Sequence, residues 1–520
     1  MEYRFDQVKE IGAALCNDFW HHRNRGDRPE KGEAYENILT VNNFLPYDID
    51  RTVTVDLDFE PDYPAQYEEP FGYERINCFK IYDAQGKEIP YQITEIKRDY
   101  LYCGRKDVHT VTFRANIPAF GTAAYKIVPH SPAVRYLEKM KAGMNFAENA
   151  FIRMDILPNG SLKITDKKTG KIYTELGNLV DDGEIGDGWY HVNPVNDRVI
   201  SSCGGSCIIE RVEYGPARCV FKVTREFNVP EEMITDKFGK HRSEKTVTLK
   251  FESYVGLSEE SRFVDVKLCY NNIAKDHRLR MLIPTGIDAD TYFSGQAFYC
   301  CERKTGIDYT TQDWRETDQY EKATNGIFGK RDKDGCGIAF VSAAGLHECA
   351  AYDDEDGSLS VTLSRSFRTT KLTNGETRCQ INLPLEYSFI LAPLDSNVAY
   401  SDLLRLQDIL ATDVMTWLKP VVPGTSVAQP QSRLLVGGKD IAVSIIKKAE
   451  SSEKNAIIVR VFNASKEAAE GFIKTEKIIE KAEATNLNEE KISDMKTENN
   501  LLKFNLSPWK IATFKLYLKN

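Results

Sequence analysis

An acidic loop with flat aromatic side chains is the part of this sequence whose residue types could do chemistry. Residues 181–194 read DDGEIGDGWYHVNP, which places four carboxylates beside a tryptophan, a tyrosine and a histidine. Carboxylates accept hydrogen bonds from hydroxyl groups, and aromatic faces pack well against the apolar side of a ligand ring. The loop is therefore a candidate sugar-facing segment, and a solvated turn is the alternative that its spacing leaves open.

A predicted hairpin comes directly before this loop and must position it. Residues 151–176 contain two alternating apolar runs joined by Asn159-Gly160, and a further turn covers Asp166 to Gly170. An Asn-Gly pair between alternating runs is the strongest short-range hairpin signal, because both residues tolerate the positive φ that the turn needs.

Motifs for metal or phosphate chemistry are missing from the sequence. The eight histidines form no His-x-His, His-x-x-x-His or His-x-Asp pattern, and Cys203 and Cys207 have no second cysteine pair, so buried thiols are favoured over zinc there. Gly437-Gly438-Lys439 lies between two apolar runs and is predicted as a hairpin turn rather than a phosphate loop. No Gly-x-Ser-x-Gly motif of a serine hydrolase appears.

Two further charged motifs have structural interpretations. The run Asp353 to Gly357 (DDEDG) lacks the spacing of a calcium loop and is predicted as a solvated hairpin tip. In Asp276-His277-Arg278, strand alternation would place Asp276 and Arg278 on one face as an ion pair, with His277 on the other. Glycosidases usually carry two carboxylates across the scissile bond, and no such pair is assigned from the sequence.

Composition excludes several classes of partner. The 520 residues carry 68 Lys and Arg against 77 Asp and Glu, a net charge of −9, without a basic run. Nucleic acid and anionic membrane surfaces are therefore not expected as partners. No secretory signal and no membrane-spanning run of apolar residues is recognisable. The 12 scattered cysteines predict reduced, mostly buried thiols and a cytoplasmic protein.

Hydrophobic periodicity predicts a mainly β protein after a short helix. Residues 1–25 place apolar side chains at helical spacing, with nothing before Met1 to cap the helix. Alternation begins near Ile38 and continues for most of the chain, which indicates stacked antiparallel sheets. A connector at 420–430 (PVVPGTSVAQP) precedes a last set of strands, and we expect a strand rather than a helix within 474–491. The expected domains are a helical remnant (1–36), a small β domain (37–132), a large β-sandwich (133–425) and a C-terminal β domain (431–520).

Several segments together resemble glycoside hydrolase family 38, the zinc-dependent α-mannosidases, and especially its bacterial branch. The similar segments, which follow the family's order, are 42–59 (NNFLPYDIDRTVTVDLDF), 147–173, 181–194, 271–287 (NNIAKDHRLRMLIPTGI), 337–367 and 504–516 (FNLSPWKIATFKL). The resemblance spans almost the whole chain and is specific for the family's carboxy-terminal β region. It implies a large β-sandwich, or supersandwich, flanked by small β-sandwich domains.

The family's catalytic residues have no counterpart here. Family members carry a catalytic barrel whose zinc is held by a His-x-Asp pair, a second Asp that is also the nucleophile, and a His of a His-Asp motif. This sequence has neither dipeptide pattern, so we assign no catalytic residue, no metal ligand and no cofactor to it, and expect the zinc in the missing barrel. The resemblance makes residues 181–194 a rim of the sugar site, with Asp187, Trp189 and Tyr190 as candidate substrate-binding residues.

Two functions remain open at this point. The first is a component of an α-mannosidase that acts on mannosides only when joined by a barrel-containing polypeptide, the chain itself being a split or truncated product. The second is a non-catalytic carbohydrate-binding or scaffold protein. A homo-oligomeric assembly is left open in both.

Overall fold

The computed structural model describes residues 36–59, 63–67, 75–98, 107–237, 239–370, 373–375, 377–421, 427–450 and 455–519. The helix predicted for residues 1–25 and the domain that contains it lie outside these residues. Across the described part almost every element is an antiparallel β-strand, as the alternation predicted. The mainly β fold class is thus confirmed.

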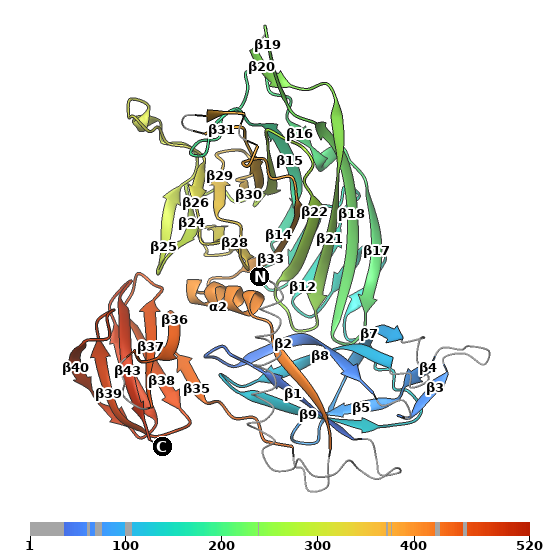
Figure 1. The fold of residues 1–520 in the computed structure, drawn as a ribbon, viewed down its shortest axis with the longest axis vertical. Coiled ribbons are helices and arrows are strands. Elements are labelled where there is room, and N and C mark those ends of the chain that lie inside the picture. Colours follow the sequence, from blue (N-terminus) through green and yellow to red (C-terminus); the bar gives the residue numbers. More distant parts are fainter. Residues whose placement is uncertain are drawn as a thin grey trace. The chain divides into compact units, whose positions relative to one another are not determined.

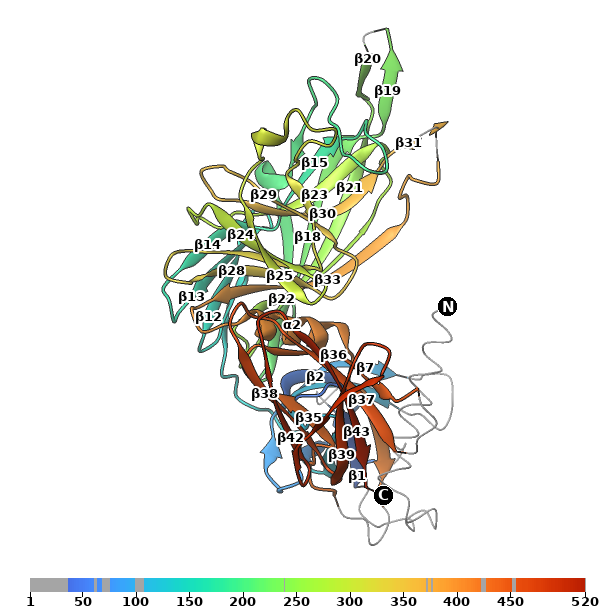
Figure 2. The ribbon, with the colours of Figure 1, turned by 90° about the vertical axis from the view of Figure 1, so that its left-hand side faces the viewer.

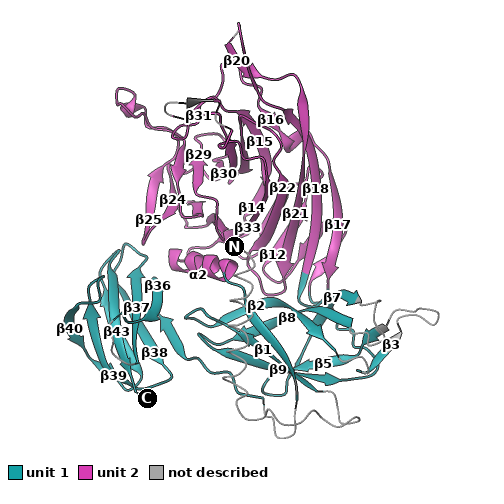
Figure 3. Ribbon diagram, viewed as in Figure 1, with its two compact units in different colours: residues 1–139, 215–218, 412–520 teal, residues 140–214, 219–411 magenta. Residues whose placement is uncertain are grey.

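The chain forms two compact units, coloured separately in Figure 3. Unit 1 comprises residues 1–139, 215–218 and 412–520, and unit 2 comprises residues 140–214 and 219–411. Among the described residues, unit 1 contains two main hydrophobic cores with separate sets of strands, and unit 2 contains one large core and a smaller one.

The first core of unit 1 lies between a five-stranded and a three-stranded sheet. The five-stranded sheet contains, in order, β34 (Met415–Pro420), β1 (Asn37–Asn42), β9 (Thr122–Pro129), β5 (Phe79–Tyr82) and β6 (Glu88–Ile89). The three-stranded sheet contains β2 (Ile49–Asp58), β8 (Asp107–Ile117) and β7 (Tyr91–Arg98). A short pair, β3 (Ala65–Tyr67) and β4 (Arg75–Asn77), accompanies them. In β2 the side chains of Val53, Val55 and Leu57 are buried while Thr54 and Asp56 are exposed, which confirms the predicted alternation.

The second core of unit 1 is a small sandwich near the C-terminus (Figure 2). One sheet contains four strands, β35 (Leu434–Gly437), β38 (Ala469–Thr475), β42 (Leu501–Leu506) and β41 (Thr497–Glu498). The other contains five, β36 (Ile441–Lys448), β37 (Ala456–Asn463), β43 (Ile511–Leu518), β39 (Ile479–Thr485) and β40 (Lys491–Met495). The strand expected within 474–491 is β39. The hairpin predicted at 437–439 is wrong, because β35 pairs with β38 whereas β36 pairs with β37. The glycines let the chain cross from one sheet to the other.

Unit 2 is built from three sheets around one core (Figure 1). The nine-stranded sheet contains β17 (Cys207–Tyr214), β18 (Arg218–Pro230), β21 (Thr246–Ser258), β22 (Val264–Asn271), β33 (Pro384–Leu394), β28 (Gly337–Ser342), β27 (Ile327–Arg331), β24 (Thr291–Gln296) and β25 (Tyr299–Lys304). The six-stranded sheet contains β16 (Ile200–Ser201), β15 (Asn178–Gly183), β23 (His277–Ile283), β30 (Leu359–Ser366), β29 (Glu348–Ala351) and β26 (Glu321–Ala323). The five-stranded sheet contains β10 (Lys141–Ala142), β11 (Phe146–Glu148), β12 (Ile152–Ile156), β13 (Leu162–Asp166) and β14 (Ile172–Leu176). Two ribbons, β19 (Met233–Asp236) with β20 (Gly239–Arg242) and β31 (Thr369–Thr370) with β32 (Thr373–Asn374), complete it.

The predicted turns of unit 2 form where the sequence placed them. Asn159-Gly160 joins β12 to β13. Gly160 has φ +81°, a backbone conformation that costs free energy for residues with a Cβ. The acid run ends at Gly357, at φ +54°, in the turn between β29 and β30, and Ser358 donates its N–H to the carboxylate of Asp354. The hairpin-tip interpretation of residues 353–357 is confirmed.

Helix α2 (Tyr400–Ala411) is an exception to the strands predicted for residues 133–425. Leu403 packs with Ile327 and Val341 in a core of its own, and the Asp402 carboxylate accepts the N–H of Ala399 at 2.9 Å. The leucines at 403, 406 and 410 have the helical spacing that could have revealed it.

The cysteine prediction is wrong in one respect. Of the ten cysteines among the described residues, all free, only Cys78, Cys219 and Cys349 are buried, six are half-buried and Cys203 is exposed. Half-burial arises because several of these strands have one face toward water.

No helix in the described ranges is long and apolar enough to cross a membrane.

We expect Phe251→Ala to destabilise unit 2 by about 3–5 kcal/mol, the usual loss for a buried phenylalanine. The ring is fully buried between Phe227, at a centroid distance of 5.3 Å, and Tyr270, at 4.9 Å. Urea unfolding followed by circular dichroism measures the change. Phe298→Ala, at a side chain 37% exposed, is the control and should shift the midpoint little; equal shifts would contradict this packing.

Candidate functional site

The candidate site lies at one end of the six-stranded sheet of unit 2, where β15, β23 and β30 lie side by side. All six residues of β15 are buried, although its sequence is NLVDDG. Asp181 and Asp182 therefore belong to a strand, and not to the loop that the sequence suggested. As consecutive strand residues they point to opposite faces and require separate partners.

Asp181 forms a buried ion-pair and hydrogen-bond network with a histidine and an arginine. One carboxylate oxygen contacts Nδ1 of His277, and the other accepts a hydrogen bond from Arg242. Nε2 of His277 lies 3.0 Å from Oδ1 of Asn272, whose amide nitrogen donates to the carbonyl of Ile381 at 2.7 Å. That donation identifies Oδ1 of Asn272 as the amide oxygen, so both ring nitrogens of His277 face acceptor oxygens.

Asp182 accepts hydrogen bonds from two arginines of β23. Arg278 donates to both carboxylate oxygens, at 3.0 and 2.8 Å, and Arg280 donates to Oδ2 at 2.7 Å. Burial works to raise the pKa of Asp182, but the Arg278 hydrogen bonds and the charges of both arginines outweigh it, so the pKa lies below its ordinary value. This carboxyl group is held as an anion.

Glu184 connects the sheet to the loop that follows. One of its oxygens accepts from the backbone N–H groups of Gly186, at 2.6 Å, and Val192, at 3.3 Å. The other contacts Nδ1 of His191 at 2.7 Å and accepts from Nε of Arg365 at 2.5 Å. Burial tends to raise the pKa of Glu184, yet the bonds from His191 and Arg365 lower it overall.

Arg365 contacts the loop from β30, which is separated from β15 by β23. Besides Glu184 it donates to the carbonyl oxygens of Asp187 and Tyr190, which are the two ends of the loop tip. The tip itself is a tight turn in which Asp187 donates its N–H to Tyr190 O at 3.1 Å. Residues 185–192 are thus held at base and tip by one carboxylate and one guanidinium, and we call them the rim loop.

The three predicted substrate-binding residues all lie at the tip of the rim loop. Oδ1 of Asp187 accepts the N–H groups of Trp189, at 2.8 Å, and Tyr190, at 3.1 Å, so it shapes the turn. The side chain of Trp189 is 65% exposed and that of Tyr190 36% exposed. The structure brings these residues together and presents the two rings to solvent.

A second exposed aromatic segment adjoins the rim loop and was missed from the sequence. The Glu316 carboxylate lies near the Tyr190 phenol. The pKa of Tyr190 is raised, mainly by partial burial and next by the negative charge of Glu316. Tyr309 and Trp314, in the same segment as Glu316, are each 67% exposed. A tyrosine and a tryptophan within a few residues of an acid are the sequence pattern that could have indicated this segment, as they did for the rim loop.

The interpretation of Asp276-His277-Arg278 as an ion pair within the motif is wrong. Asp276 lies before β23 at φ +51° and pairs with Arg368, whereas Arg278 pairs with Asp182 and Glu321. The positive φ interrupts the strand alternation on which the prediction relied. His277 has a carboxylate partner, but it is Asp181, 96 positions away.

The residues of this site do not fit a metal ion. Within the described ranges no three His, Cys, Asp or Glu side chains are grouped as metal ligands. Each of Asp181, Asp182 and Glu184 already binds an arginine, and a guanidinium beside a carboxylate repels a cation. We therefore derive no chemistry through a metal at this site.

Comparison with known proteins gives matches of three kinds. The sequence model of the glycosyl hydrolases family 38 C-terminal beta sandwich domain matches residues 440–514. A curated protein of Halalkalibacterium halodurans named "Putative mannosylglycerate hydrolase" is 24% identical over 404 residues, which are 72% of this chain and 41% of that protein. The resemblance to glycoside hydrolase family 38 is confirmed.

Two solved structures from Enterococcus faecalis share the fold. An α-mannosidase from strain V583 has a TM-score of 0.76 at 19% identity, with 99% of this chain and 60% of that chain covered. A family 38 glycosyl hydrolase has a TM-score of 0.75 at 19% identity, with 99% and 62% covered. The chain spans less than two thirds of the length of each of these relatives.

We expect Arg365→Met to loosen the rim loop, because Glu184 would remain buried with one fewer cation and two loop carbonyls would lose their donor. Hydrogen exchange of the amides of residues 185–192 should accelerate about tenfold to a hundredfold, because loss of one charged hydrogen-bond partner costs roughly 1.5–3 kcal/mol. Arg198→Met is the control, since its partner Glu244 has a 94% exposed side chain. Unchanged exchange in Arg365→Met would contradict the assigned contacts.

The pH dependence of the rim loop follows from Glu184. Because its folded pKa lies below the ordinary value of 4.5, its stabilising contribution is complete above about pH 4.5 and is lost as the pH falls through the folded pKa. Exchange of amides 185–192 in the wild type should therefore accelerate below pH 4.5 relative to amides of β12. In Glu184→Gln this additional acceleration should be absent, and parallel profiles for the two proteins would count against the assignment.

Proposed function

We propose that this chain is the carboxy-terminal β region of an α-mannosidase-like glycoside hydrolase, and that it takes part in α-mannoside hydrolysis only with a zinc-bearing catalytic barrel. The match at residues 440–514 and the likeness of 99% of the chain to part of two longer solved proteins support this proposal. Its partners are then a mannoside and a barrel-containing polypeptide, and its setting is the cytoplasm.

The rim loop supports the proposal, because a buried ionic network holds the backbone that presents its two exposed aromatic rings. A loop backbone that is already held in place loses little conformational entropy when a ligand binds to it. Trp189 offers such a ring for the apolar face of a mannose unit, and Tyr190 adds a second ring and a hydroxyl. One oxygen of Asp187 shapes the tip, which leaves its other oxygen for a sugar hydroxyl.

The buried acids of this site are positioning groups. A retaining glycosidase requires one carboxylate to attack the anomeric carbon and one carboxylic acid to protonate the leaving oxygen. Asp182 and Glu184 are anions whose oxygens are occupied by arginine, histidine and backbone N–H groups. As anions bound by cationic side chains they are weak nucleophiles without a proton to give, so in this proposal the chemistry belongs to residues of the barrel.

The alternative is a non-catalytic carbohydrate-binding or scaffold protein. The pairing of Asp181, Asp182 and Glu184 with arginines supports it equally, since both functions leave these acids without a chemical role. The two functions differ in what happens when a barrel polypeptide is added.

One assay tests both proposals. The purified chain is analysed for bound zinc and assayed on an aryl α-mannoside and on mannosylglycerate, with and without a barrel-containing family 38 polypeptide. We expect no zinc and no hydrolysis with the chain alone, and hydrolysis when both polypeptides are present.

The rim loop is tested in the same system. Trp189→Ala should raise KM about five- to tenfold, as expected for loss of one aromatic contact, while kcat changes less. Val195→Ala, at a side chain 83% exposed, is the control. Hydrolysis by the chain alone would overturn the enzyme-component proposal, and no stimulation by any barrel polypeptide would favour the scaffold.

A further inference from the structure

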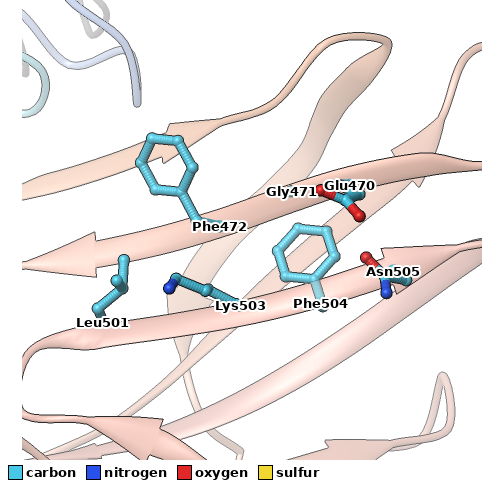
Figure 4. Close-up of a pocket in the computed structure, with 7 residues that line it drawn as sticks. All are labelled: Glu470, Gly471, Phe472, Leu501, Lys503, Phe504 and Asn505. Atoms are coloured by element: carbon cyan, nitrogen blue, oxygen red, sulfur yellow. The ribbon is translucent and has the colours of Figure 1, made fainter.

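The outer face of the C-terminal sandwich carries a groove that belongs to no site described so far. It has a volume of about 670 Å³, within the usual range of ligand sites. Its walls come from the adjacent strands β38 and β42 (Figure 4). The lining residues are Glu470, Gly471, Phe472, Leu501, Lys503, Phe504 and Asn505.

Phe472 lies flat across a glycine of the neighbouring strand. Phe472 is opposite Gly437 of β35, and a Cβ built on Gly437 would come within 2.4 Å of the Phe472 ring. Strand alternation places Ala469, Gly471 and Ile473 toward the core, so Phe472 is on the outer face of the sheet. The glycine therefore lets the ring lie along the sheet as a platform, with its other face turned outward.

Polar side chains of β38 and β42 lie on the same outer face, while the Phe472 ring extends from β38 toward β35. Glu470 is opposite Asn505 in the register, and Lys503 is opposite Phe472. Figure 4 shows the Glu470 carboxylate and the Asn505 amide next to each other at one end of the groove, and Lys503 with Leu501 at the other. Among the described residues, Glu470 and Asn505 have no side-chain partner, and Lys503 reaches only Glu498, at 3.7 Å, with both side chains mostly exposed.

We propose that this groove binds one pyranose unit of a neutral glycan. The Phe472 ring would pack on the C–H face of the sugar, while Asn505, Glu470 and Lys503 would donate to and accept from its hydroxyls. The negative charge of Glu470 and the positive charge of Lys503 sum to zero, so the groove favours a neutral ligand over an anion or a cation. This inference concerns unit 1 and stands apart from the rim loop of unit 2.

A structural role for Phe472 makes a different prediction. Any large apolar side chain would cover Gly437, so Phe472→Leu should keep the fold while removing the ring face. Sugar binding would require the aromatic ring and the polar side chains. Covering Gly437 would require only a large apolar side chain. The leucine variant thus separates the two roles without unfolding the domain.

Affinity electrophoresis of the whole chain in gels that contain a neutral α-mannan tests the proposal, with methyl α-D-mannopyranoside as competitor. The wild type should be retarded and the competitor should release it. Phe472→Leu should weaken retardation about five- to tenfold, and Asn505→Ala about fivefold, the value of one hydrogen bond. Ile492→Ala, at a side chain 69% exposed in β40 on the other sheet, should behave as the wild type.

The outcomes also separate this groove from the rim loop. Trp189→Ala should keep the retardation that Phe472→Leu loses. If Trp189→Ala loses it and Phe472→Leu keeps it, binding belongs to the rim loop and the groove proposal is overturned. No retardation of the wild type, or retardation only by an anionic polysaccharide, would overturn it as well.

Discussion

The burial of three carboxylates beside one another in the chain is the constraint on which the candidate site depends. Asp181, Asp182 and Glu184 are each almost fully buried, and an unpaired buried carboxylate would cost far more than a fold can supply. Each is therefore matched by an arginine from a different part of unit 2: Arg242, Arg278 and Arg365. These arginines tie β15 to the β19–β20 ribbon, to β23 and to β30.

This pairing explains how an exposed loop can hold a fixed shape. Removing either partner of a buried pair would leave the other charge uncompensated, so the pairs specify one arrangement even where they add little net stability. Because Glu184 and Arg365 both contact the backbone of the rim loop, they fix the backbone positions from which its exposed rings project. The C-terminal groove obtains a fixed ring in a simpler way, by laying Phe472 over Gly437.

Local patterns in the sequence were sufficient for much of the fold. Alternation in residues 49–58 and the Asn159-Gly160 turn depend on neighbouring residues, and the structure contains both. The aromatic tip at Asp187, Trp189 and Tyr190 was identifiable for the same reason. The partners of the acids were not, because Arg365 lies 181 positions from Glu184 and His277 lies 96 positions from Asp181. Two local predictions were wrong because they assumed regular strands. The positive φ at Asp276 interrupts the alternation of side chains, and the chain crosses between two sheets at Gly438.

A double-mutant cycle between Glu184 and Arg365 tests the central claim most directly. Hydrogen exchange of residues 185–192 is compared among the wild type, Glu184→Gln, Arg365→Met and the double variant. Because the two groups act as one buried pair, the account predicts a coupling free energy of roughly 1.5–3 kcal/mol, with the double variant little worse than either single variant. Additive effects, with coupling below about 0.5 kcal/mol, would contradict it.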